Sequence, residues 1–309
     1  MTLHPQSQAF LAAVAEAQAP QWYERELADA RRVFDTLPFF GDPPSVAEVL
    51  DENIAGVSVR IYKPDVVNEP SGTIVFFHGG GWVLGSIASH DVLCRRLAIA
   101  SGASVVSVDY RRPPEDPFPA AIEDCFTVCD VLSMDHASYG ISGPMLVAGD
   151  SAGGNLAAAV CMMSRDRGGP RLAGQVLIYP VLDGSMSGQT YQDYADGFGL
   201  TAKTMQWFWQ NYTGDPTSPN RRHPLASPLS EESLDGLPPA HIVIAQYDVL
   251  RSEAEAFIAR LESAGVPTTS EIYEGMLHGF IHFSQAFDCS LVAINEIGRC
   301  TREMLNGAS

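Results

Sequence analysis

Two glycine-rich segments of the chain carry residues that suit hydrolytic chemistry. The segment GDSAGG (149–154), which contains Ser151, directly follows the apolar run MLVA and precedes the helical pattern NLAAAV. A serine held on a tight turn between a strand and a helix exposes its hydroxyl for nucleophilic attack, and Gly149 and Gly153 leave room for such a turn. A serine that only caps the helix would fit the same residues, so this segment alone leaves both interpretations open.

The segment HGGGW (78–82) follows the apolar run TIVFF and favours the nucleophile interpretation. Consecutive glycines leave backbone N–H groups uncovered, so that they can converge on an oxyanion that develops during a reaction. A phosphate-binding loop is the alternative, but neither G-x-x-x-x-G-K-[ST] nor G-x-G-x-x-G is present there, and the chain is poor in cationic residues. An oxyanion-binding turn is the preferred interpretation.

A nucleophilic serine needs a base, and the base needs a group that orients it. Asp248 ends the apolar run HIVIAQYD, and His278 lies in EGMLHGF, which overlaps the end of the run TTSEIYEG. The order serine, acid, histidine, with each residue at the end of a later strand, is a known arrangement of a catalytic triad. Ser151, Asp248 and His278 are therefore the candidate nucleophile, orienting acid and base.

Other titratable residues fit structural roles better. His282 forms an H-x-x-x-H pair with His278, but Gly279 disfavours a regular helix there, and no glutamate is placed as in H-E-x-x-H. A metal site is therefore not expected. Glu253 and Glu255 are expected to stabilise the first turn of the helix after Asp248 or its local hydrogen bonds. Structural roles are also expected for His223 and His241.

Alternating strand and helix patterns must position these residues. Short apolar runs rich in β-branched residues alternate with helical patterns, which predicts a mostly parallel sheet covered by helices on both faces. The expected strands cover 57–64, 73–80, 103–110, 145–150, 175–180, 241–248 and 268–275. The expected helices in this region cover 87–101, 119–134, 151–166, 251–264 and 284–305.

Two regions stand outside this alternation. The chain opens with two amphipathic helical segments, over 7–19 and 21–37. Residues 183–222 carry an irregular polar stretch and then an aromatic helix over 201–212. We interpret 183–222 as an insertion over the carboxyl ends of the strands, where α/β folds bind their ligands.

The composition restricts the classes of partner. The 309 residues, 46% of them hydrophobic, suffice for one large α/β domain with an insertion. The net charge of −18 argues against nucleic acid, anionic membrane surfaces and strongly anionic substrates. No apolar run approaches the ~20 residues that span a bilayer, and the first residues lack the pattern of a secretory signal, so a cytoplasmic protein is expected. The six cysteines lack C-x-x-C spacing and are expected to be reduced core thiols.

As a set, five motifs resemble the hormone-sensitive lipase-like family of α/β-hydrolases, whose microbial members are mostly small carboxylesterases. The motifs are HGGGW, YRRPPEDPFPAAIED (110–124), GDSAGG, YDVLRSE (247–253) and HGF (278–280), and they occur in the family's order. The resemblance runs from about residue 58 to the end of the chain. It implies an α/β-hydrolase fold: a mostly parallel central sheet with helices on both faces and a helical cap.

The resemblance also implies roles for eight residues. The catalytic triad would be Ser151, Asp248 and His278. The oxyanion hole would be formed by the backbone N–H groups of Gly80, Gly81 and Ala152. His78 and Asp150 would support the surrounding loops without reacting.

The resemblance further implies how the chain is organised. Residues 1–45 and 183–222 would form the cap that shapes the acyl pocket, and residues 46–182 and 223–309 would form the α/β-hydrolase core. Dimers through the edge strand over 268–275 would be in keeping with the family. The chain departs from the family pattern at Val249, where proline is common, and at Ser252, where an acidic residue is usual. These departures leave the triad intact.

The expected reaction is hydrolysis of a small-molecule ester with a short or medium acyl chain, through an acyl-enzyme intermediate and without a metal or organic cofactor. Aromatic residues of the expected cap suggest a small apolar pocket, although they would equally serve to pack the cap onto the core. They are Trp22, Phe34, Phe198, Trp207, Phe208 and Trp209. One alternative is an amide or N-formyl hydrolase with the same triad. Another is a non-catalytic small-molecule receptor, which the retained His278 disfavours.

Overall fold

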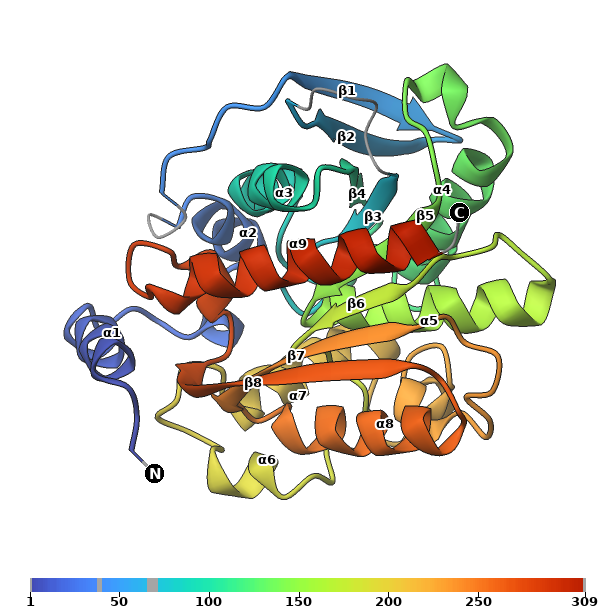
Figure 1. Cartoon of the computed structure of the whole chain (residues 1–309). Helices are drawn as coiled ribbons and strands as arrows, with labels where there is room; N and C mark the ends of the chain where they lie inside the picture. Colours follow the sequence, from blue (N-terminus) through green and yellow to red (C-terminus); the bar gives the residue numbers. More distant parts are fainter. Residues whose placement is uncertain (1, 38–40, 66–71, 308–309) are drawn as a thin grey trace.

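The computed structural model describes residues 2–37, 41–65 and 72–307. Its centre is an eight-stranded sheet (Figure 1). The strand order is β1-β2-β4-β3-β5-β6-β7-β8. The pairs β1–β2 and β2–β4 are antiparallel, and the other neighbours are parallel. The strands are β1 Glu48–Ile54, β2 Val57–Lys63, β3 Thr73–Phe77, β4 Ser104–Asp109, β5 Met145–Asp150, β6 Gln175–Ile178, β7 Ala240–Tyr247 and β8 Thr268–Leu277.

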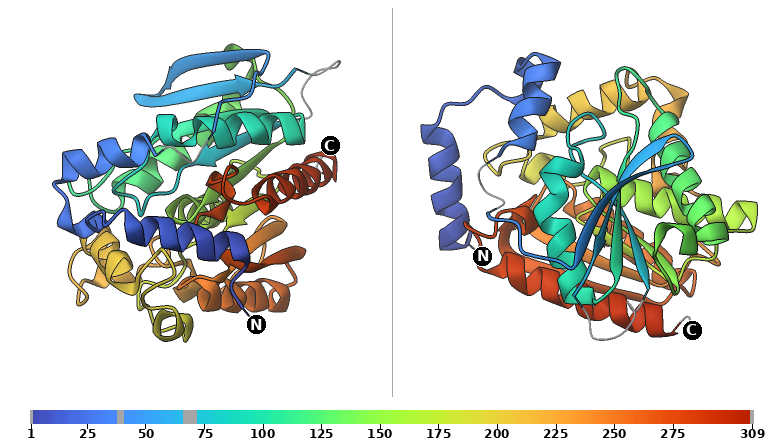
Figure 2. Two further views of the ribbon diagram at one scale, coloured as in Figure 1. Left: turned by 90° about the vertical axis from the view of Figure 1, so that its left-hand side faces the viewer. Right: turned by 90° about the horizontal axis from the view of Figure 1, so that it is seen from above.

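Five long helices cover the two faces of the sheet (Figure 2). Side chains of α3 (Ile87–Ser101) and α9 (Cys289–Gly307) pack on one face, and those of α4 (Ala120–Asp135), α5 (Ala152–Arg167) and α8 (Arg251–Ser263) pack on the other. Successive side chains of a strand point to opposite faces, so β3 contributes to both cores, and each of its residues is buried. The predicted fold class, an α/β-hydrolase fold with a mostly parallel sheet, is confirmed.

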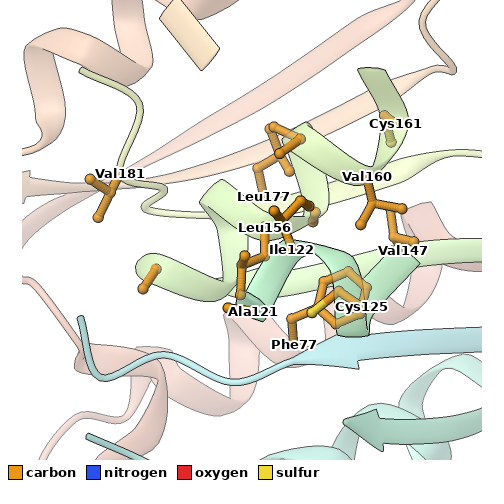
Figure 3. Close-up of a cluster of buried hydrophobic side chains, with 14 of the residues drawn as sticks. Phe77, Ala121, Ile122, Cys125, Val147, Leu156, Val160, Cys161, Leu177 and Val181 are labelled. Carbon is orange, nitrogen blue, oxygen red and sulfur yellow. The ribbon is translucent and has the colours of Figure 1, made fainter. Parts of the chain in front are cut away.

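The core around α5 fixes this helix against the centre of the sheet. Leu156 and Val160 on α5 lie close to Val147 of β5 and Leu177 of β6 in Figure 3, and all four are fully buried. Burying a side chain of this size stabilises the fold by about 1.5–3 kcal/mol relative to leaving it exposed. The first turn of α5 is therefore anchored at a defined place on the sheet.

The remaining helical elements lie outside the sheet and its covering helices. At the N-terminal end they are α1 (Pro5–Glu16), η1 (Trp22–Glu24) and α2 (Leu27–Asp35). After β6 the chain forms α6 (Thr190–Asp193), α7 (Ala202–Thr213), η4 (Pro219–Arg222) and η5 (Pro228–Ser230). Two further short turns are η3 (Ala137–Tyr139) and η6 (Phe280–His282). Helix α1 lies beside β8, where the Ser7 hydroxyl donates to the carbonyl oxygen of Gly275 at 2.7 Å.

The structure differs from the expected elements in three places. The helix expected over 21–37 is split into η1 and α2, because Arg25 and Glu26 have extended backbone conformations. The last helix begins at Cys289 rather than near residue 284. Strand β1 was not expected, because most of its residues are exposed and the acidic sequence EVLDENI lacks a clean apolar alternation.

The division into cap and core stays a prediction. Residues 1 and 38–40 of the expected cap, and residues 66–71 and 308–309 of the expected core, lie outside the described residues. Within the described ranges, no helix combines the length and the apolar character that crossing a membrane would require. The six cysteines all lie in these ranges and are free; Cys289 is half-buried and the other five are buried.

Candidate active site

Ser151 occupies the sharp turn between the end of β5 and the start of α5. Its backbone angles are φ 54° and ψ −115°, a conformation that non-glycine residues rarely adopt and that costs about 1–3 kcal/mol. Three hydrogen bonds hold the turn. The Ser151 amide donates to the carbonyl oxygen of Ile178 at 2.8 Å, and the Ser151 carbonyl oxygen accepts from the amides of Asn155 and Val181, both at 3.1 Å. The serine side chain therefore lies at the carboxyl edge of the sheet.

Gly153 allows the elbow to approach the neighbouring strand. A methyl group at this position would overlap the carbonyl oxygen of Phe77, the last residue of β3. A methyl group at Gly149 would likewise overlap the backbone of Gly153. The two glycines of the G-x-S-x-G pattern are thus required by close packing, as the sequence predicts.

The structure brings Ser151, His278 and Asp248 together. Nε2 of His278 lies 3.0 Å from the Ser151 hydroxyl oxygen, and Nδ1 lies 2.6 Å from Oδ2 of Asp248. Asp248 is 2% exposed, and its Oδ1 accepts a hydrogen bond from the Leu250 amide at 2.9 Å. An imidazole with these two partners can accept the serine proton while the carboxylate holds its other nitrogen protonated.

Sheet topology explains why residues so distant in the sequence meet. Asp248 follows β7 and His278 follows β8, and these strands are adjacent and parallel, so both residues lie at the same edge as Ser151. Tyr179, which follows β6, packs its ring against the imidazole of His278 with 4.6 Å between centroids. Sequence analysis did not single out Tyr179, although its place after a strand of the same edge was a usable signal.

The HGGG turn lies next to the elbow, after β3. Gly80 and Gly81 have φ values of +108° and +61°. Their amides, and that of Ala152 in the first turn of α5, donate to no acceptor among the residues that the structure describes. A methyl group at Gly81 would overlap the ring of Phe208 on α7, so this aromatic ring covers the turn directly. Unpaired amides in such a place are suited to bind an oxyanion.

Asp150, the residue before Ser151, joins the HGGG turn to two histidines. Its Oδ1 accepts from the Gly79 amide at 2.9 Å and lies 3.1 Å from Nε2 of His90, and its Oδ2 lies 2.9 Å from Nε2 of His282. Burial disfavours the charged carboxyl, but the two imidazoles outweigh burial and hold the pKa of Asp150 well below its usual range. Asp150 is therefore a buried anion.

His78 is fully buried beneath the same turn. Its ring stacks on Tyr110 with 4.2 Å between centroids, and the Tyr110 hydroxyl donates to the His78 carbonyl oxygen at 2.7 Å. Burial lowers the pKa of His78 well below its ordinary value, so the imidazole is neutral near pH 7. Nδ1 of the ring lies 2.8 Å from the carbonyl oxygen of Gly79 at the start of the turn, so a role of His78 in supporting this loop stays a prediction.

The H-x-x-x-H pair does not act as a pair in the structure. His278 contacts Ser151 and Asp248, whereas His282 contacts Asp150. Ligating atoms of His90, Asp150 and His282 lie within 4.8 Å of one another, a spacing that a metal ion could bridge. However, Gly79 and His282 already supply N–H groups to the two carboxylate oxygens, so hydrogen bonding satisfies Asp150 without an ion.

The other titratable residues weighed from the sequence lie in structural contacts. Glu253 accepts hydrogen bonds from the amides of Leu182 and Asp183, both at 3.1 Å, and so fixes α8 to the segment after β6. Glu255 pairs with Arg251 of the same helix, and Nδ1 of His223 accepts from the amide two residues later. Nδ1 of His241 lies 2.9 Å from the Thr269 hydroxyl, at the opposite end of β7 from Asp248.

Comparisons with known proteins point to one group. Residues 74–282, which include Ser151, Asp248 and His278, match the family described as alpha/beta hydrolase fold. The chain is 36% identical over 290 residues to the carboxylic ester hydrolase LipN of Mycobacterium tuberculosis, across 90% of this chain and 76% of LipN. It is 32% identical over 306 residues to an ethyl acetate hydrolase of Pseudomonas putida, across 93% and 95% of the two chains. Among solved structures, the ester-hydrolase EH1AB1 from the metagenome of Lake Arreo has a TM-score of 0.93 at 35% identity and covers 99% of this chain and 100% of its own.

Proposed function

The chain belongs to the hormone-sensitive lipase-like α/β-hydrolases and is a carboxylic ester hydrolase, and from this premise we propose that Ser151 is the nucleophile that cleaves short- to medium-chain acyl esters. The observation that carries the proposal is the position of the His278 imidazole, 3.0 Å from the Ser151 hydroxyl and 2.6 Å from the Asp248 carboxylate. This geometry suits proton transfer from the hydroxyl to Nε2.

The reaction would proceed in two halves. Nε2 of His278 accepts the Ser151 proton as the hydroxyl oxygen attacks the ester carbonyl carbon, and Asp248 stabilises the resulting imidazolium. The amides of Gly80, Gly81 and Ala152 would bind the oxyanion of the tetrahedral intermediate.

The leaving alcohol then takes the proton from His278, and an acyl-enzyme ester remains on Ser151. In the second half, His278 activates a water molecule that attacks this ester. The carboxylic acid leaves, and the proton returns to Ser151.

The proposed preference for small acyl groups is based on the aromatic side chains of α7, one of which lies on the HGGG turn. The Phe208 ring lies directly on Gly81, and α7 presents Trp207 beside it with 5.1 Å between ring centroids. An aromatic side chain of α7 is thus in direct contact with Gly81 of the turn. The name of the related ethyl acetate hydrolase accords with a small ester, and the net charge of −18 disfavours a strongly anionic one. A homodimer would use β8, the edge strand of the sheet, and stays a prediction.

An acyl-length series on wild-type protein and Ser151→Ala tests the proposal. We expect p-nitrophenyl acetate and butyrate to give the highest kcat/KM and long-chain esters the lowest. We expect Ser151→Ala to lower kcat by at least about 10⁴-fold. Ser133→Ala, an exposed serine on α4, is the matched control and should keep wild-type activity.

A fluorophosphonate should label the wild-type chain and leave Ser151→Ala unlabelled. Ester turnover that survives in the alanine variant would remove Ser151 from the mechanism. A higher kcat/KM on amide or N-formyl analogues than on the matching esters would contradict the proposed ester substrate and favour an amide or N-formyl substrate.

A further inference from the structure

The Asp150 carboxylate is the point where three active-site loops meet. Asp150 ends β5, directly before Ser151 on the elbow, and it accepts a hydrogen bond from Gly79 on the turn after β3. Its other oxygen lies 2.9 Å from Nε2 of His282, on the loop after β8. One side chain thus connects the loops that carry the candidate nucleophile, the oxyanion donors and the base.

His282 lies close to the base in the sequence. It ends the short turn η6, which begins two residues after His278. This loop is held by the Ser290 hydroxyl, which donates to the Phe280 carbonyl oxygen at 2.6 Å, and by Phe10 of α1, which stacks on Phe283. Closer to His278, the buried ring of Phe280 packs against Tyr179 and Tyr273. His282, four residues after His278, supplies the hydrogen bond from this loop to Asp150 beside the elbow.

The charges of the two partners favour this anchor. Asp150 is 4% exposed and ionised, so it needs N–H donors in place of water. Burial lowers the pKa of His282, so its imidazole is neutral near pH 7 and donates its Nε2 proton to the carboxylate. Hydrogen bonds to an ionised group are among the stronger ones in proteins, and this one is shielded from solvent.

His90 provides a natural comparison on the same carboxylate. Its Nε2 lies 3.1 Å from Oδ1 of Asp150, and its ring contacts that of His282 with 4.7 Å between centroids. However, His90 belongs to α3 and has no chain connection to the loop that carries His278. Both histidines therefore lie against the same carboxylate, and His90 Nε2 also accepts from the Gly79 amide at 3.1 Å, but only His282 links the carboxylate to the loop of the base.

We infer that His282 is a positioning residue of the hydrolytic site, which holds the loop of His278 against the elbow of Ser151 through Asp150. The inference rests on the proposed function, because it concerns the proton transfer between His278 and Ser151. The hydrogen bond of His282 Nε2 goes to Asp150, whereas the Ser151 hydroxyl contacts His278. Loss of His282 should therefore lower kcat, since the base is displaced, and should change KM little.

Three substitutions separate positioning from bulk packing. His282→Gln places an amide N–H near the position of Nε2, His282→Asn is polar but too short to do so, and His282→Leu removes the donor. With p-nitrophenyl butyrate as substrate, we expect the Leu and Asn variants to lower kcat by about 10–100-fold and to change KM by no more than about twofold. This loss of kcat is only a part of the about 10²–10⁴-fold acceleration that a general base supplies. We expect Gln to recover most of the wild-type kcat. The rate of Ser151 labelling by a fluorophosphonate should follow kcat in all three.

Several outcomes would overturn the inference. Equal kcat values for the Gln and Asn variants would show that donor position is irrelevant, even if the Leu variant fails to fold. If His90→Leu lowers kcat as much as His282→Leu does, the loss comes from the changed surroundings of the Asp150 carboxylate and not from the link between Asp150 and the loop of His278. A wild-type chain without ester turnover or Ser151 labelling would instead refute the proposed function, so the two failures are distinguishable.

Discussion

Ser151 keeps an unfavourable backbone conformation that its neighbours maintain. The φ of 54° at a non-glycine residue is stabilised by the hydrogen bond to Ile178 and by the packing that Gly153 permits against β3. A turn of this kind directs the side chain away from the sheet and toward His278. The reactive geometry is therefore built in before substrate binds, so no conformational change is needed to form the contact between serine and imidazole.

Asp248→Asn should impair catalysis without disturbing the fold. Asparagine can still accept from the Leu250 amide, but it can place an NH₂ group against Nδ1 of His278 and so favour the wrong imidazole tautomer. We expect kcat for p-nitrophenyl butyrate to fall by about 10⁴-fold, with an unchanged thermal midpoint. Asp166→Asn, which lies exposed on α5, is the control and should keep wild-type kcat. A loss smaller than about tenfold would contradict the role of Asp248.

Single residues differ in how far the sequence predicts them. The roles of Ser151, Asp248 and His278 follow from motifs and from their order at strand ends, and the structure places these three in contact. His90 and Tyr179 carry no motif. His90 lies within a helix, and Tyr179 approaches His278 only because β6 lies between β5 and β7. The contacts of His90 arise from tertiary packing, which periodicity along one chain does not encode, whereas the place of Tyr179 after a strand was a usable signal.

Helix α7 contacts the site through the ring of Phe208, which lies on Gly81 of the HGGG turn. Phe208→Ala would remove that ring from Gly81 and enlarge the space above Ser151. We expect the kcat/KM ratio of p-nitrophenyl octanoate to acetate to rise by about tenfold, since added methylenes can then be buried. The free energy of unfolding should fall by about 3–5 kcal/mol, because Phe208 is buried.

Gln206→Ala supplies the matched control for this prediction. Gln206 is exposed on the same helix, so its truncation should change neither the chain-length ratio nor the stability by a measurable amount. An unchanged ratio in Phe208→Ala would mean that α7 does not limit the acyl group.

At the scale of elements, the sequence predicts buried segments better than exposed ones. The runs TIVFF and MLVAGD are apolar because both faces of the strand are covered, and they form β3 and β5 as expected. Strand β1 is an antiparallel edge strand with mostly exposed residues, so its composition resembles that of a loop. The break between η1 and α2 depends on local hydrogen bonds of Arg25 to Pro20 and Asp29, which helical spacing does not reveal.

The whole molecule gathers its site at one edge because most of its strands are parallel. Strands β3, β5, β7 and β8 all end where the HGGG turn, the elbow, Asp248 and His278 begin. The strand–helix alternation predicts that residues at the ends of parallel strands meet at one edge of the sheet. The buried histidines of this architecture were not predictable as a group, because burial of a polar side chain is decided by the assembled core.

The buried histidines should make the whole molecule sensitive to acid, and His241 tests this away from the site. Burial lowers the pKa of His241 below its ordinary 6.5, so below about pH 6.5 the unfolded chain binds a proton that the folded chain does not. Stability contributed by the neutral imidazole is present above this pH and is lost as the pH falls, by up to about 1.4 kcal/mol per pH unit. Urea unfolding at pH 7, 6 and 5 should therefore show a shallower decline for His241→Gln than for wild type. The exposed His136→Gln is the control; parallel declines for all three proteins would exclude His241 as a source of the acid sensitivity.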